Sequence, residues 1–302
     1  MKSLAESSAQ LSAVAAHAAT RQPRARRWLL PVRAWLGILL VGVFVIGGVV
    51  APWLAPHPPQ EQQIALRLRP PAFLEGGTSG YLLGTDQLGR DVLSRIIYGA
   101  RISLSVSGLA TLGAAGVGTL LGTLSGFYGG AAEQILMRLV EVQMAFPYLL
   151  LAIAFMLVVP PNIVNIAIVL AISGWVVHAR VMRVNALALR GQEFVVAASA
   201  IGARDHRILL RHIAPNLLPT VTVLATTQIA QFIIAESALS FLGVGLPPSM
   251  PSWGNIMNDG RQYLDSAWWI EVFAGLAIIL ATAGVGLLGD WLRDALDPHL
   301  RV

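Results

Sequence analysis

Apolar runs of about 20 residues recur along the chain, and each is long enough to cross a hydrocarbon core of about 30 Å. Hydrophobic residues make up 55% of the 302 residues and charged residues only 12%, whereas soluble domains contain about 25% charged residues. A soluble protein could not bury so many apolar segments, so the pattern predicts an all-α membrane protein. Six spans are expected, at about residues 34–54, 102–127, 135–159, 163–180, 217–244 and 268–288.

The distribution of positive charge predicts the orientation of these spans. Six spans place both termini on one side of the membrane, and the loops and span ends of that side hold fifteen of the 21 Lys and Arg residues. Lys and Arg bias short loops toward the cytoplasm. We therefore expect residues 1–33 to form a cytoplasmic tail, residues 34–302 to form the membrane domain, and residues 55–101 to form a loop on the periplasmic side. The charge indicates topology and lipid contact rather than nucleic-acid binding.

Two absences exclude classes of chemistry. The chain has no cysteine, so it has no disulfide, thiolate nucleophile or Cys-based metal site. Its only lysine is Lys2, so it has no Walker A motif, which needs a lysine beside the phosphates. His178 and His212 each lack a second ligand at metal spacing. We expect no catalytic residue, metal or cofactor in this chain, and a partner must bind and hydrolyse any ATP that it uses.

A polar segment at residues 193–216, EFVVAASAIGARDHRILLRHIAPN, separates the fourth and fifth predicted spans. Residues 194–201 are expected to form a short helix, and Gly202 suits the left-handed turn that ends one. Asp205 is expected to cap the next helix, and Pro215 fits the first turn of the fifth span. Small side chains let another protein's backbone come close, so one helix face favours docking: Ala197, Ala198 and Ala200.

The spacing of this segment resembles the EAA loop of ABC importer permeases, E-A-A-x3-G-x9-I-x-L-P. Four positions match it: Ala197, Ala198, Gly202 and Pro215. Three positions differ, because Val196 stands at the glutamate, with Glu193 as the nearest acid, and His212 and Ala214 stand at the isoleucine and the leucine.

The resemblance implies that the segment forms a coupling helix that docks in a groove of a cytoplasmic ATPase subunit. The implied contact residues are Glu193, Phe194, Val196, Ala197, Ala198, Ala200, Gly202, Arg207 and Arg211. Two of them, Arg207 and Arg211, are spaced i, i+4 on one helical face. They could meet acidic groups of a partner or lipid phosphates.

Five stretches, two of them in or overlapping this segment, resemble the C-type permease of dipeptide and oligopeptide importers, a branch that also includes permeases for nickel and glutathione. They are LGTDQLGRDVLSRIIYGAR, EFVVAASAIGA, LLRHIAPNLLP, ESALSFLGVGLPPSMPSWGN and LLGDWLRDALDP. The resemblance covers about residues 34–298. It implies a six-span type I importer fold in the bacterial inner membrane that passes short peptides. It also implies a homologous B-type permease subunit, two ATP-binding subunits that hold ATP and magnesium, and a solute-binding protein.

Strongly polar groups inside a span are costly and usually face a bundle interior or a cavity. The fifth span holds four candidates to line a translocation path: Gln228, Gln231, Glu236 and Ser237. Glu236 could pair with a peptide amino terminus or a cation, or it could form a hydrogen bond between helices that secures their packing. The sequence leaves both roles open.

The periplasmic loop closes with a segment in which Asp86 is expected to cap an amphipathic helix on the membrane surface. Asp86, Arg90 and Asp91 are candidates to contact solute at an outer entrance. The pattern favours a second role, in which these residues and Arg95 form a local ion-pair network that fixes the start of the second span.

Three other functions remain open from the sequence. The same machinery could import nickel, glutathione or another small solute, although a cation permease should have more acids or histidines along its spans. A stand-alone secondary transporter should show inverted repeats with charged broken helices, and none is seen. A membrane scaffold without transport would leave the polar groups of the fifth span packed rather than in contact with water.

Overall fold

The computed structural model describes residues 31–296, and this part of the chain is helical without any strand. The five long helices are α2 (Val32–Val49), α4 (Val92–Tyr128), α7 (Ile163–Arg190), α10 (Ala214–Phe241) and α12 (Trp269–Leu296). Each is long and apolar enough to cross a membrane, and the number of spans is six if a bent pair of shorter helices forms one span. The all-α membrane fold is confirmed. Most of the predicted tail and residues 297–302 lie outside the described residues.

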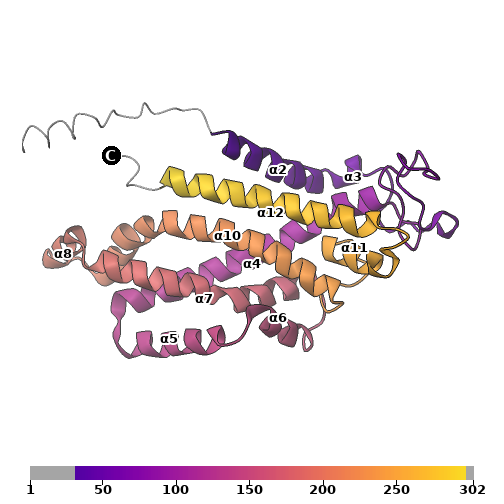
Figure 1. The fold of residues 1–302 in the computed structure, drawn as a ribbon. Helices are drawn as coiled ribbons and strands as arrows, with labels where there is room; N and C mark the ends of the chain where they lie inside the picture. Colours follow the sequence, from indigo (N-terminus) through magenta and orange to yellow (C-terminus); the bar gives the residue numbers. More distant parts are fainter. Residues whose placement is uncertain (1–30, 297–302) are drawn as a thin grey trace, which may run out of the picture.

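The shorter helices connect these spans (Figure 1). They are α3 (Ala51–Leu54), η1 (Ile64–Leu66), α5 (Gly130–Met144), α6 (Tyr148–Met156), α8 (Glu193–Ala200), α9 (Asp205–Ile208), the π-helical turn η2 (Leu209–Ile213), α11 (Trp253–Gly260) and η3 (Arg261–Tyr263). In Figure 1, α8 lies at one end of the body and α3 and α11 lie at the other. Arg33 at the start of α2 pairs with Asp294 near the end of α12, so the two ends of the described chain lie together.

The second span differs from the prediction. We expected a surface helix ahead of a span at residue 102, but a single 37-residue helix, α4, begins at Val92. Its N-cap is Asp91, whose side chain accepts a hydrogen bond from the Ser94 backbone N–H. Asp86 was the wrong choice of cap, because its carboxylate instead accepts hydrogen bonds from the backbone N–H groups of Leu88 and Arg90 in the preceding turn.

The third span, expected as one helix over residues 135–159, consists of α5 and α6 with a bend of 86° between them. Pro147 lies at the bend and is the N-cap of α6. Proline has no backbone N–H, and its ring disfavours helical geometry in the preceding residue, here Phe146. A proline-induced break is therefore the local cause of the bend. The helices α7 and α12 also extend beyond their predicted ends at residues 180 and 288.

Glycines spaced four residues apart let α4 and α7 pack closely at the centre of the fold. A Cβ atom added to Gly118, Gly122 or Gly126 would lie within 2.4 Å of a backbone carbonyl oxygen of α7. Small residues at this spacing allow two helix backbones to approach each other in a membrane. The α4–α7 pair then packs against α10, and α2 and α12 lie side by side beyond it (Figure 1).

Candidate functional site

The segment at residues 193–216 folds as two helical pieces around a glycine turn, as the sequence predicted. Helix α8 ends at Ala200, and Gly202 has a φ angle of +83°. The backbone N–H of Ala203 donates to the Ala198 carbonyl oxygen at 3.1 Å across this turn. Such left-handed turns satisfy the free carbonyl groups at a helix end. The prediction for Gly202 is therefore confirmed.

Helix α8 has one buried side and one exposed side. Val195 and Ala198 pack inward against a cluster that contains Met182, Ile208 and Ile213. The other side is exposed and includes the apolar residues Phe194, Val196, Ala197 and Ala200 and, beyond the helix end, Ile201. The polar residues Glu193, in the first turn, and Ser199 are exposed as well. Ala198 is only 8% exposed, so it packs on the inner face of the helix and is not part of the outer face with Ala197 and Ala200. The outer face is broader and more apolar than the alanine pattern indicated.

The second piece runs without a break from α9 through the π-helical turn into α10. Pro215 lies in the first turn of α10, as predicted. Asp205 is not the cap of α9, because Arg204 takes that position with an extended backbone and Asp205 lies in the first turn. The side chains of Arg204, Arg207 and Arg211 are exposed. The segment therefore presents an apolar helix face beside three cations at one end of the molecule.

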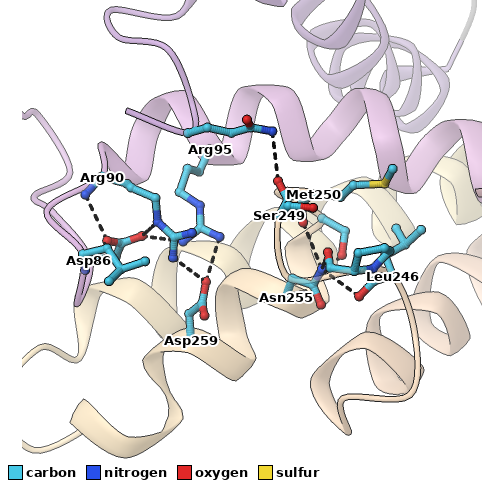
Figure 2. Close-up of polar contacts among 12 residues, drawn as sticks. Asp86, Arg90, Arg95, Leu246, Ser249, Met250, Asn255 and Asp259 are labelled. Atoms are coloured by element: carbon cyan, nitrogen blue, oxygen red, sulfur yellow. Dashed lines mark hydrogen bonds and ion pairs between the residues drawn. The ribbon is translucent and has the colours of Figure 1, made fainter. Parts of the chain in front are cut away.

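At the opposite end, a buried ion-pair cluster joins the start of α4 to α11 (Figure 2). Asp86 accepts hydrogen bonds from Arg90 Nε at 2.6 Å and from Arg95 Nη1. The Nη2 atoms of both arginines donate to Asp259 Oδ2, each at 2.8 Å. The predicted network of Asp86, Arg90 and Arg95 is confirmed, but Asp91 is not part of it, and Asp259 of α11 was missed. Because Asp86 is fully buried, an entrance role for these residues stays a prediction.

The two outer loops are tied into one layer beside this cluster. Asn255 Nδ2 lies within hydrogen-bonding distance of the carbonyl oxygens of Leu246, Pro247 and Met250, at 2.9 to 3.2 Å (Figure 2). Gln60 Nε2, from the loop before α4, donates to the Ser249 carbonyl oxygen at 3.1 Å. These side chains hold the proline-rich loop before α11 against the first loop, so both loops and α11 form one structured cap.

The four predicted path residues separate into two pairs. Gln228 and Gln231 line a groove of about 200 Å³ between α10, α7 and the α5–α6 bend. Glu236 instead lies fully buried and accepts hydrogen bonds from Ser103 of α4 at 2.8 Å and from Ser240 at 2.9 Å. Ser237 is also buried, against the start of α11, where it contacts Gly254 closely. Of the two roles left open for Glu236, the hydrogen bond between helices is the one present in this structure.

Gln143 contributes to the groove and has no counterpart among the predicted site residues. Its Nε2 donates to the carbonyl oxygens of Ile172 and Ser173, and its Oε1 accepts from Trp175 Nε1. These contacts fasten the end of α5 to α7. Within residues 31–296 no group of three or more His, Asp or Glu could hold a metal ion, and the absence of a metal stays a prediction.

The sequence of this chain matches family profiles and known proteins over most of its length. Residues 118–302 match the profile described as binding-protein-dependent transport system inner membrane component, and residues 32–71 match the N-terminal TM domain of oligopeptide transport permease C. The di/tripeptide transport system permease protein DppC of Pseudomonas aeruginosa is 38% identical over 88% of each chain. The dipeptide transport system permease protein DppC of Escherichia coli K12 is 40% identical over 89% of each chain. The protein of the same name from Haemophilus influenzae is 36% identical over 89% of this chain and 91% of that protein.

Proposed function

We propose that this chain, which belongs to the family of binding-protein-dependent transport system inner membrane components, is the permease subunit of an ATP-driven importer of short peptides. The relatives are named for di- and tripeptide transport, and they align with this chain over nearly its full length. We place it in the bacterial inner membrane, with both termini in the cytoplasm. The chain itself carries no catalytic residue, and ATP and magnesium bind to partner subunits.

Four partner chains complete the proposed importer. A homologous B-type permease faces this chain across the translocation path, and two ATP-binding subunits lie on the cytoplasmic side. A solute-binding protein delivers peptide to the cap formed by the outer loops and α11. Alternating access requires two conformations whose balance ATP shifts, and the coupling free energy between the ATPase and the path passes through the docked segment.

The exposed face of α8 is the observation that carries this proposal. An apolar helix face of Phe194, Val196, Ala197 and Ala200 on a short helix at the end of a membrane bundle is suited to a protein groove. Val196 replaces the acid of the related motif, so this contact is apolar at that position. The neighbouring Arg204, Arg207 and Arg211 match acidic groups on the rim of such a groove.

The absence of charge in the groove favours peptide over a metal cation as the solute. None of the described side chains that line it is charged, and they instead carry amides, hydroxyl groups, a thioether, aromatic rings and aliphatic groups. A divalent cation prefers carboxylate or imidazole ligands. A neutral groove that contains amides and aromatic rings suits a peptide, whose backbone is polar and whose side chains vary.

Cysteine cross-linking tests the docking role directly, because the chain has no native cysteine. We expect Ala200→Cys to cross-link to a cysteine in the groove of the ATPase subunit, with a yield that changes when ATP is added. Ala198→Cys is the matched control, since it lies on the same helix and faces inward. Equal cross-linking of the two variants would contradict the docking face. Failure of both, in membranes that retain ATP-dependent peptide uptake, would show that coupling uses another surface.

A further inference from the structure

The groove beside α10 contains a polar atom that the fold leaves unpaired. Gln228 is only 4% exposed, and its Nε2 donates to the Gly174 carbonyl oxygen of α7 at 2.9 Å. Its Oε1 is buried but accepts no hydrogen bond from any residue in the described part of the chain. A buried acceptor without a donor is costly, and nearly all such groups in folded proteins are satisfied. The Oε1 atom is therefore an acceptor whose donor is not among the described residues.

The environment of Gln228 holds its amide in place. A Cβ on Gly174 would lie 2.8 Å from Gln228 Nε2 and 2.6 Å from the ring of Phe232. The lack of a side chain at Gly174 thus lets both side chains pack against the α7 backbone. With Nε2 fixed on Gly174, the amide plane is set and Oε1 has a defined position in the groove wall.

The other amides of the groove differ in availability. Both the Nε2 and the Oε1 atoms of Gln143 already form hydrogen bonds with α7, so this amide is not available to a ligand. Gln231 lies three residues after Gln228, about one helical turn further along α10, and is exposed. The two glutamines of α10 thus present a fixed acceptor and an exposed amide on the same stretch of groove, beside the aromatic rings of Phe146, Tyr148 and Phe232.

We infer that Gln228 Oε1 accepts a hydrogen bond from a backbone N–H group of the transported peptide, with Gln231 as a second contact. This inference rests on the proposed function. A backbone N–H is common to almost all peptides, so this contact favours the peptide class without selecting a side chain. Ligand pockets usually measure about 300–1,000 Å³, and this groove is smaller, about 200 Å³. The chain therefore supplies one wall, and a partner subunit supplies the rest.

A substitution paired with a modified substrate tests the hydrogen bond itself. The complete importer is reconstituted in liposomes with ATP and a saturating concentration of preloaded binding protein, so that the affinity of that protein does not enter. The substrates are dialanine and its analogue with a methylated peptide nitrogen, which has no peptide N–H. We expect the parent chain to transport dialanine about three- to tenfold faster than the analogue, since one neutral hydrogen bond is lost.

The Gln228→Leu variant should transport both substrates at similar, lower rates. Thr227→Val is the matched control, because Thr227 is the adjacent residue, is exposed, and bonds only to Val223 of its own helix. It should keep the parent preference for dialanine. If Gln228→Leu keeps the same preference while its overall rate falls, Gln228 has a structural role only and the inference is wrong.

Labelling of introduced cysteines gives a second test that does not depend on the Gln228 variant. Gln231→Cys should react with a water-soluble thiol reagent, and transported dialanine should slow that reaction severalfold. Ile234→Cys is exposed on α10 but does not line the groove, so dialanine should leave its reaction unchanged. If dialanine does not protect Gln231→Cys in a complex that transports it, the inference is wrong, whereas the proposed function still holds. Absence of any uptake that requires ATP and binding protein in the parent complex would overturn the proposed function instead.

Discussion

Replacing Gly122 by isoleucine should separate α4 from α7 and strongly reduce the yield of folded protein. A Cβ at this position would lie 2.3 Å from the carbonyl oxygen and 2.8 Å from the Cα of Ala179. These are backbone atoms of a helix, so they cannot rotate away as a side chain can. Overpacking a well-filled core costs about 1–3 kcal/mol, and we expect a loss at or above the upper value. Detergent-resistant folded protein, measured by size-exclusion chromatography over a temperature series, gives the readout.

Gly116→Ile provides the control for this prediction. Gly116 lies on the same helix, and a Cβ there would have no neighbouring atom within 4 Å. Both variants add the same side chain to an equally helical position, so their difference isolates the close approach of the two backbones. Similar losses in both would mean that glycine at position 122 reflects something other than α4–α7 packing.

Replacing Asp86 by alanine should cause the second large loss of stability. Asp86 is fully buried, and it is the shared acceptor for Arg90 and Arg95. Its removal leaves two buried guanidinium groups, and Asp259 is then their only acidic partner within residues 31–296. Removing one member of a buried ion pair costs about 3–5 kcal/mol, because the remaining charge stays uncompensated. Hydrogen–deuterium exchange should therefore become faster in α11 and in the first turns of α4, and the thermal unfolding temperature should fall.

Glu141→Ala supplies the comparison for an exposed ion pair. Glu141 pairs with Arg138 at 3.1 Å, and the side chains are 63% and 83% exposed. Exposed pairs of this kind contribute about 0–1 kcal/mol, so this variant should unfold near the parent temperature. An Asp86→Ala protein that unfolds with the parent would show that the buried cluster adds no net stability, as can happen when the cost of burying charge matches the attraction.

Local chemistry explains which features the sequence could predict. Gly202 and Pro215 were placed correctly, because the left-handed turn and the first helical turn depend on the residue itself and its neighbours. The spans were found by their length and polarity. The arginine–aspartate contacts of Asp86 were also within reach, since the partners are four and nine residues away.

Contacts between distant segments explain what the sequence could not predict. Asp259 is 164 residues from Arg95 and joins the cluster only because α11 folds back on α4. Ala198 looked equivalent to Ala197 and Ala200 until the packing of α8 buried it. The unpaired oxygen of Gln228 follows from the bond of its Nε2 to Gly174, and no periodicity in α10 encodes that contact.

The bend between α5 and α6 sets a condition on when this subunit is stable. Lipid offers no hydrogen bonds to irregular backbone, so such backbone persists at membrane depth only where protein or water covers it. Phe146, at the 86° bend, is 57% exposed in this chain, and the partner permease proposed above would cover it. Synthesis of this chain in excess over the partner that covers the bend should therefore lead to its degradation, which would keep the subunits of the importer in fixed proportion.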